Sequence, residues 1–136
     1  MILKSLLLLI FCGMVQAQQP AVKQVPAKPT ASVAGKDLFH QYCAVCHGPD
    51  GKGGGPAAPA MKSHPTDLSQ ISRNNGGKFP DDHIMQVLKG EASVTAHGNQ
   101  AMPVWGTVFS NMSTNLVLTQ SRMHGLVQYI ADMQAK

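Results

Sequence analysis

Apolar side chains recur at helical spacing in three stretches of this chain, over residues 35–42, 80–89 and 115–134. No stretch shows the strict apolar–polar alternation of a half-buried strand, and no internal repeat is present. The pattern therefore predicts a small all-α domain. The side chains expected to face its core are Leu38, Phe39 and Tyr42 in the first stretch, Ile84, Val87 and Leu88 in the second, and Leu116, Met123, Leu126, Val127, Ile130 and Met133 in the third, where Gln120 is a polar break.

Residues typical of helix ends surround these stretches. Pro80 stands at the start of the second and Gly90 directly after its end, an arrangement common at helix termini. Asp67 follows a proline-containing segment and is expected to cap a short helix. Residues 48–56, 73–77 and 97–106 are rich in turn-forming residues and are predicted to be irregular.

The sequence of the first helix indicates how it packs. Gly35 lies one helical turn before Phe39, and a glycine beside an aromatic side chain leaves a notch that suits a close helix crossing. Tyr129, in the last helix, is expected at the edge that faces the first helix.

Changes in composition divide the chain into three segments. Residues 1–17 combine Lys4, a short apolar run and a small-residue end, as secretory signal peptides do. A membrane span needs about 20 apolar residues, so an uncleaved anchor is the weaker alternative. Residues 18–33 are rich in Pro and Ala and predict an extended, disordered linker. The folded domain is then expected over residues 34–136.

One short motif carries recognisable chemistry. Cys43 and Cys46 are separated by two residues and followed by His47, a C-x-x-C-H pattern typical of covalent c-type haem attachment. Two thiols at this spacing lie on one side of a helical turn, where each forms a thioether with one haem vinyl group. The imidazole of His47 is then held beneath the iron as its proximal ligand.

Two other interpretations of paired cysteines fit less well. A thioredoxin-like redox pair is expected within a βαβ pattern, which the flanking sequence lacks. A zinc site needs two further ligands at close spacing, and no second cysteine pair exists, since Cys12 belongs to the predicted signal peptide.

Charge narrows the range of partners. The chain has 11 Lys+Arg against 7 Asp+Glu, and loss of Lys4 with the signal peptide leaves ten against seven, or +3. The basic residues form no cluster or stripe, so nucleic acid is not expected as a partner. A weakly positive face suits docking to an acidic redox protein.

The order of helix, C-x-x-C-H, glycine loop, helix, Met-Pro loop and terminal helix resembles the class I c-type cytochromes over residues 34–135. The likeness is strongest to bacterial mono-haem members with H-G-x-x-G-x-G-x-G-P-A, P-x-D-L, R-N-G-G, F-P and A-H-G…M-P-x-W-G. These patterns stand here at residues 47–57, 65–68, 73–77 (with Asn74 as an extra residue), 79–80 and 96–106. The resemblance implies a small cytochrome c fold, with about four to five helices around one covalently bound haem c.

The resemblance also implies Met102 as the distal ligand of the iron. A soft thioether favours the reduced metal and raises its reduction potential, and Pro103 helps to hold the loop rigid. The alternative ligands are His97, then His64, and the loop methionines Met61 and Met112, which lack the following proline.

Further roles around the haem follow from the same likeness. A proline carbonyl is expected to accept the Nδ1–H of His47, from Pro65 or else Pro59. Trp105 is expected to donate its indole N–H to a haem propionate, or else to be a core aromatic. Arg73 is expected to balance the propionate charge, or else to be a solvated surface residue. The histidines on predicted helices, expected at the surface without a role, are His40, His83 and His124.

Residues and resemblance together predict a periplasmic, monomeric electron carrier and not an enzyme, since two axial ligands leave the iron no position for a substrate. Its partners would be donor and acceptor redox proteins, such as a dehydrogenase and an oxidase, with membrane contact only through an uncleaved anchor or a membrane-bound partner. One alternative is a haem c subunit fixed to a larger dehydrogenase or terminal oxidase, which would co-purify at high salt. Another is a peroxidase-like or sulfur-oxidising haem enzyme, which would have an open, high-spin distal position.

Overall fold

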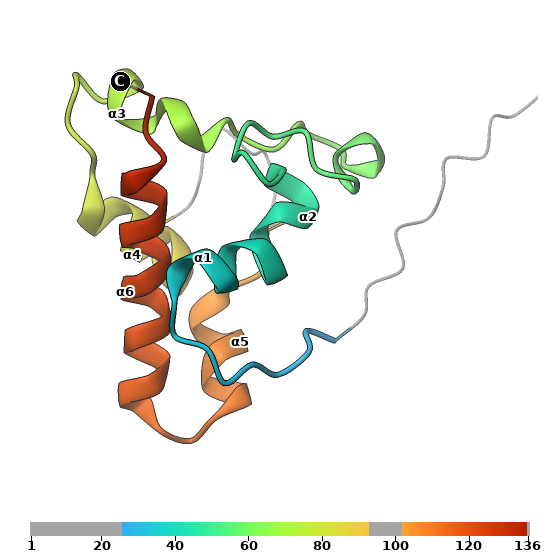
Figure 1. Ribbon diagram of the computed structural model, residues 1–136, viewed down its shortest axis with the longest axis vertical. Coiled ribbons are helices and arrows are strands. Elements are labelled where there is room, and N and C mark those ends of the chain that lie inside the picture. The colour runs from blue at the N-terminus through green and yellow to red at the C-terminus, as the bar shows by residue number, and fades with distance from the viewer. Residues whose placement is uncertain (1–25, 93–101, 136) are drawn as a thin grey trace, which may run out of the picture.

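The computed structural model describes residues 26–92 and 102–135, and within these ranges every regular element is a helix, which confirms the all-α prediction (Figure 1). None of the helices in these ranges is long and apolar enough to cross a membrane. The predicted signal peptide (1–17), the first part of the predicted linker (18–25) and His97 lie outside the described residues. The helical segments are α1 (Gly35–Leu38), η1 (Phe39–Cys43), α2 (Ala44–His47), η2 (Ala58–Ala60), η3 (Leu68–Gln70), α3 (Ile71–Asn74), α4 (Asp81–Lys89), α5 (Trp105–Met112) and α6 (Leu116–Asp132).

The segments α1, η1 and α2 follow one another without a break and form one N-terminal rod. Its middle is a π-helical turn, in which the amide of Ala44 donates to the carbonyl of Phe39. Such turns often occur at functional sites. Gly48, with a φ of 77°, ends the rod in a conformation that favours glycine. The helix predicted over 35–42 is therefore confirmed, and it continues through His47.

The terminal helix α6 crosses this rod at a pair of glycines (Figure 1). A Cβ atom on Gly35 would fall on the carbonyl group of Gly125, and one on Gly125 would lie 2.5 Å from the carbonyl oxygen of Val33. The rings of Phe39 and Tyr129 then meet with centroids 5.3 Å apart. The predicted close crossing is confirmed, with Gly125 as the partner that the sequence pattern did not single out.

The helix α5 is one that the sequence pattern did not predict. Trp105 and Gly106 were expected in a loop, and Met112 in another, but all three belong to α5. Gly, Thr and Val are weak helix formers, and no side chain caps the start of α5. Burial of Trp105 and Phe109, one turn apart and 6% and 0% exposed, stabilises the helix instead.

The first turn of α6 extends beyond the core. Leu116 was predicted to be buried, but it is 70% exposed, so that prediction is wrong. The side chain of Asn115 accepts the first amides of α6, and this cap begins the helix about a turn before it reaches the rest of the domain. Thr119 and Arg122 are buried on the inner side of α6 instead.

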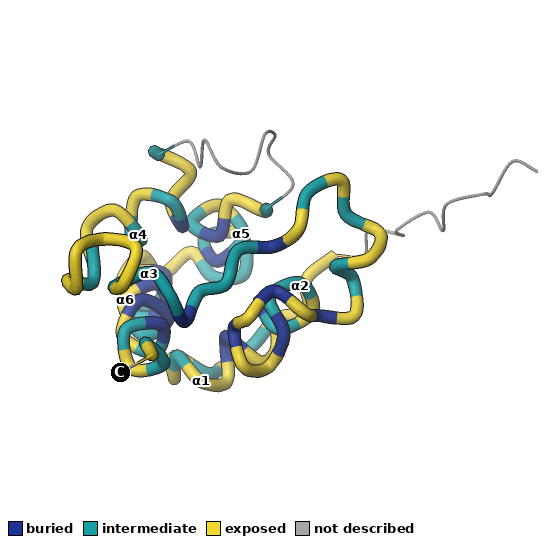
Figure 2. Tube along the Cα trace, turned by 90° about the horizontal axis from the view of Figure 1, so that it is seen from above, coloured by how far each residue is buried: buried dark blue, intermediate teal, exposed yellow. Residues whose placement is uncertain are grey.

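The predicted caps of the other helices are confirmed. The helix α4 ends at Gly90, with a φ of 75°, and the carboxylate of Asp67 accepts the amide of Ser69 at 2.9 Å. Figure 2 shows that buried positions gather on the inner sides of the helices and also in the loop after α2. Leu88 of α4 is buried, and it lines a cavity between the helices together with the half-buried Ile84 and Val87.

The glycine crossing yields a stability prediction. Gly35→Ala should destabilise the haem-loaded protein by about 2–3 kcal/mol or more, because its Cβ meets backbone that cannot move aside alone. Gly54→Ala is the control, since nothing lies within 4 Å of its Cβ position, and it should change stability by less than about 1 kcal/mol. Urea unfolding followed by circular dichroism measures both, and equal stabilities for the two variants would contradict the crossing.

Candidate cofactor site

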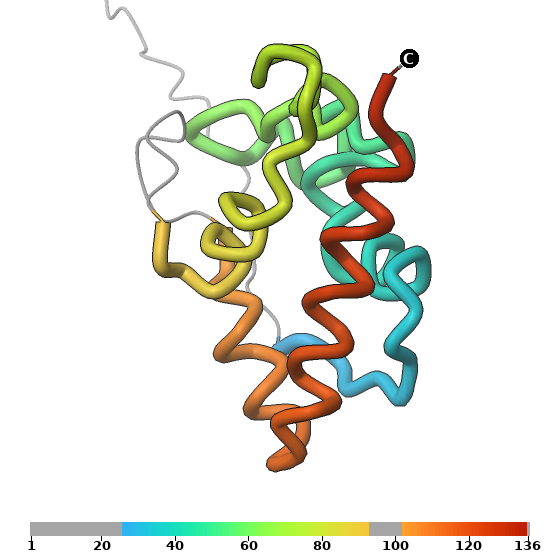
Figure 3. Tube along the Cα trace, turned by 90° about the vertical axis from the view of Figure 1, so that its left-hand side faces the viewer, coloured from blue at the N-terminus to red at the C-terminus, as the bar shows by residue number. Residues whose placement is uncertain are grey.

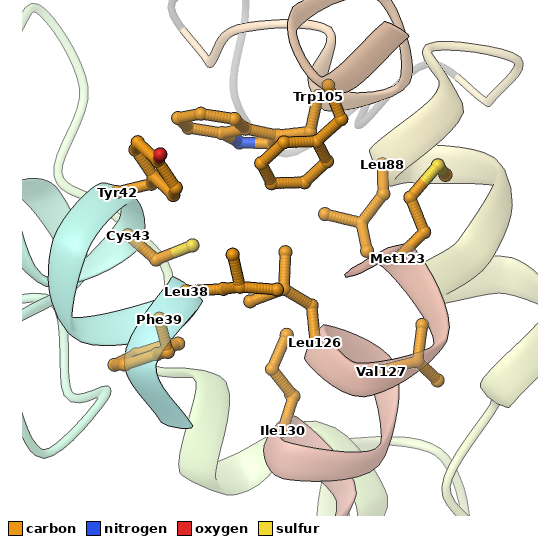
Figure 4. Close-up of a cluster of buried hydrophobic side chains, with 11 residues drawn as sticks. Leu38, Phe39, Tyr42, Cys43, Leu88, Trp105, Met123, Leu126, Val127 and Ile130 are labelled. Atoms are coloured by element: carbon orange, nitrogen blue, oxygen red, sulfur yellow. The ribbon is translucent and has the colours of Figure 1, made fainter. Parts of the chain in front are cut away.

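The Cys-x-x-Cys-His residues lie at the end of the N-terminal rod and line one cavity. Cys43 closes η1 and is buried, whereas Cys46 and His47 belong to α2 and are half-buried. Figure 4 shows the sulfur of Cys43 pointing into the space bordered by Tyr42 and Trp105. The rod therefore presents both sulfurs and the imidazole from a single rigid element.

The glycine-rich loop after His47 holds the end of this rod in place. Its amides donate to the last carbonyls of the rod, which a helix terminus leaves without intrahelical partners. A Cβ atom on Gly55 would lie 2.5 Å from the carbonyl oxygen of Val45, so glycine is needed for this close approach. The bonds run from Gly53 to His47 (2.7 Å), from Gly55 to Cys46 (3.0 Å) and from Ala57 to Val45 (2.9 Å).

A backbone carbonyl fixes the ring of His47, but it is not a proline carbonyl. The Nδ1 atom lies 3.0 Å from the carbonyl oxygen of Thr66. When Nδ1–H donates there, the other ring nitrogen, Nε2, is the one oriented to ligate a metal. The predicted use of Pro65 is wrong, because its carbonyl oxygen lies 2.9 Å from Nδ1 of His64 instead. Pro59, the alternative, is exposed in η2.

The cavity in front of these residues has a volume of about 870 Å³, within the range of sites that bury a cofactor-sized ligand. Its walls are largely apolar. They come from the rod, from the loops on either side of α3, and from three helices. The apolar residues that these three helices contribute are Ile84, Val87 and Leu88 of α4, Trp105 and Val108 of α5, and Ile130 of α6.

The structure places some of the candidate distal ligands at the cavity and others outside it. Met102 is half-buried, packs against the core and lines the cavity that His47 also lines. Met61 lines it too, from the loop before Pro65. Met112 lies in α5 outside the lining, with its sulfur 3.8 Å from the hydroxyl of Tyr42. His64 is exposed and is not part of the lining either.

The structure places Trp105 at the cavity and Arg73 away from it. The indole of Trp105 is buried, lines the cavity and packs on Tyr42 with ring centroids 5.6 Å apart. Figure 4 shows its nitrogen on the edge facing the space between the labelled side chains. Arg73 is exposed and outside the lining, which fits the alternative of a surface charge.

The polar rim of the cavity comes from residues that were not predicted for it. Asn74 and Asn75 line the cavity directly after Arg73, because α3 turns the arginine outward at its last turn. His83 of α4 also lines it, although it was expected at the surface without a role. His83 is exposed, as predicted, but the sequence pattern did not predict that it lies beside the cavity.

The electrostatics of the cysteines argue against the redox-pair interpretation considered above. Burial raises the pKa of the Cys43 thiol to about 12, with a smaller contribution from Cys46. Burial also raises the pKa of Cys46. Redox-reactive cysteines lie where the environment lowers the pKa and stabilises the thiolate, which is the opposite of this setting. Among the described residues, no three His, Cys, Asp or Glu side chains are grouped to hold a metal ion.

These residues fit a covalently attached haem. The cavity offers two neutral sulfurs in apolar surroundings, an imidazole with a fixed ring and a thioether sulfur from another part of the chain. Neutral sulfurs are what thioether links to the haem vinyl groups leave in the finished protein. The apolar walls suit the faces of a macrocycle, and Asn74, Asn75 and His83, which also line the cavity, would offer hydrogen-bond donors to its carboxylates.

Two contributions to the site were missed by sequence reasoning. Pro26, Ala27 and Lys28 line the cavity although they lie in the predicted linker. Arg122, 3% exposed, holds the chain just after them. Only the position of an arginine on the apolar side of α6 could have drawn attention to it, since proline-rich composition alone predicts a free segment.

Comparison with known proteins agrees with this geometry. The family model described as Cytochrome c matches residues 32–134. No curated protein and no solved structure gives a significant match. The matched range covers the rod, all the helices that follow it and the whole Cys-x-x-Cys-His motif. This chain therefore belongs to the cytochrome c family, whose members bind covalently attached haem c through such cysteines, here Cys43 and Cys46, and transfer electrons between redox partners.

Proposed function

We propose that this protein is an exported, monomeric one-electron carrier in which His47 and Met102 are the two axial ligands of the haem iron. The observation that carries the proposal is that both residues line the same apolar cavity, one from a rigid helix and the other from a different part of the chain. The haem supplies a one-electron couple when bound.

The protein's own side chains hold the haem, orient its ligand and exclude water. Cys43 and Cys46 anchor the macrocycle at one edge, from consecutive turns of the rod. The hydrogen bond to Thr66 keeps the ring of His47 in one orientation and makes its other nitrogen a better donor to the metal. Apolar residues such as Val87 and Leu88 exclude water from the cavity, which favours the uncharged, reduced form of the site.

Met102 as the distal ligand argues against an enzyme, because a filled sixth position leaves no place for a substrate. A thioether also makes the oxidised state less favourable than a second imidazole would. A mobile carrier with a net charge of about +3 after loss of Lys4 would meet acidic redox proteins through weak, salt-sensitive contacts. We therefore propose free diffusion between a donor and an acceptor.

Substitution of the methionines tests the ligand directly. The oxidised wild-type protein should be low-spin, with the weak sulfur-to-iron absorption band at the red end of the visible spectrum. Met102→Ala should abolish this band and lower the reduction potential, because the soft ligand is lost. Met112→Ala is the matched control, since Met112 lies outside the cavity lining, and it should keep both the band and the potential.

Three results would contradict Met102 as the ligand. Loss of the band in Met61→Ala but not in Met102→Ala would assign the position to Met61, which also lines the cavity. A low-spin wild type without the band would favour an imidazole such as His97. A high-spin wild type would favour an enzyme with an open position.

Export rests on the N-terminal pattern of residues 1–17 alone. If the segment is a cleaved signal peptide, the haem-loaded protein recovered from the periplasmic fraction should begin at Gln18. Its intact mass and N-terminal sequence measure this. Recovery of the protein with Met1 or Lys4 still attached, in the membrane fraction, would show an anchor instead.

A further inference from the structure

Residues 26–33, here called the strap, run as an extended chain into α1 and lie against the domain (Figure 3). The first three of them, Pro26, Ala27 and Lys28, line the cavity next to Tyr42 and Cys43. The family match begins only at residue 32, so most of the strap lies outside the part of the chain that the family defines. Its contacts are a property of this chain.

The cavity end of the strap is held by residues just before the first haem-binding cysteine. The hydroxyl of Tyr42 donates to the carbonyl oxygen of Lys28 at 2.5 Å, and the amide of Gln41 approaches the same oxygen at 3.4 Å. Burial raises the pKa of Tyr42, partly opposed by Arg122, so the hydroxyl keeps its proton and acts as a donor. The strap is thereby connected to the rod one residue before Cys43.

The other end of the strap is held by Arg122 of α6. Its Nη2 donates to the carbonyl oxygen of Thr30 at 2.7 Å, and its Nε donates to that of Ser32 at 3.4 Å. Ser32 in turn donates through its hydroxyl to Asp37 of α1 at 2.9 Å. These bonds fix the strap to both helices of the glycine crossing.

Holding a backbone segment with the buried side chain of Arg122 is energetically unfavourable. It is 3% exposed, its two described acceptors are neutral carbonyls, and its Nη1 is buried with no hydrogen-bond partner. Burial of a guanidinium without a compensating charge costs several kcal/mol, and an apolar side chain of similar length would pack in the same place without that cost. The contacts of Arg122 with the strap are the feature of the structure that an apolar residue would not reproduce.

We propose that the strap is a wall of the haem site that covers the cavity on the side of Cys43, with Arg122 and Tyr42 as the positioning residues that fasten it. The strap shields the nearby haem edge from water. The proposal rests on haem attachment at Cys43 and Cys46 and is independent of which residue is the distal ligand.

The test uses the haem-loaded full chain with Arg122→Met, which keeps the length and apolar packing of the side chain but removes its donors. Tyr42→Phe is a second variant that removes only one hydroxyl. Arg73→Met is the control, because Arg73 is exposed and outside the cavity. Elastase, which cleaves after small residues, is applied under native conditions, and mass spectrometry identifies cuts after Ala27 or Ala31.

The proposal predicts that both fastening variants are cleaved within the strap at least tenfold faster than wild type and that their reduction potentials fall, because water reaches the haem edge. Arg73→Met should match wild type in both respects. The red-edge absorption band should persist in all variants, which separates failure of this proposal from failure of the Met102 assignment.

Wild-type cleavage rates and potentials in both fastening variants would overturn the proposal. If Arg122→Met does not accumulate with haem, Tyr42→Phe alone decides, because loss of one hydroxyl leaves the aromatic packing with Trp105 and Phe109 in place. Faster cleavage without any fall in potential would show a strap that is fastened but does not shield the haem, and would equally overturn its role as a wall.

Discussion

The helices of this domain pack around a cavity, and the group that fills the cavity completes the core. Side chains from the N-terminal rod, α4, α5 and α6 all end at the same space of about 870 Å³, whereas protein interiors are otherwise close-packed. A small domain has a net stability of only about 5–15 kcal/mol, and apolar walls without contacts on one side lose energy in proportion to the space they enclose. The fold and the cofactor are therefore parts of one structure, which explains why so few large side chains are sufficient.

The remaining features place the attachment residues accurately at that space. The glycine crossing of α6 fixes the rod that carries Cys43 and Cys46, because the two backbones are in contact at Gly35 and Gly125. The glycine loop then satisfies the carbonyls at the end of the rod, and the carbonyl of Thr66 orients the ring of His47. These contacts come from residues outside the motif, in the loops and in α6. They make a five-residue pattern into a rigid site.

Sequence reasoning succeeded where the local pattern and the tertiary contacts favour the same structure. The rod, α4 and α6 have helical periodicity and end residues that match it, and Gly35 with Phe39 revealed the crossing. It failed where tertiary contacts decide. The helix α5 depends on burial of Trp105 and not on propensity. The choice between the carbonyls of Pro65 and Thr66 depends on the path of a loop, which no side-chain pattern records.

The strap is a segment that was predicted to be free but is held by tertiary contacts. Proline-rich composition predicts a free linker, yet Arg122, about 90 residues away in the sequence, holds the segment through two backbone carbonyls. A buried arginine on an apolar helix face is a weak signal in the sequence. The role of such an arginine depends on which backbone segment packs beside it.

We infer that the covalently held haem completes the core of the domain. The most direct measurement compares far-ultraviolet circular dichroism and thermal unfolding of the exported protein with those of a haem-free Cys43→Ala/Cys46→Ala variant. If the haem completes the core, the wild type is helical and unfolds cooperatively, whereas the variant is largely unfolded. A haem-free variant with the full helix content of the wild type and a cooperative unfolding transition would contradict it.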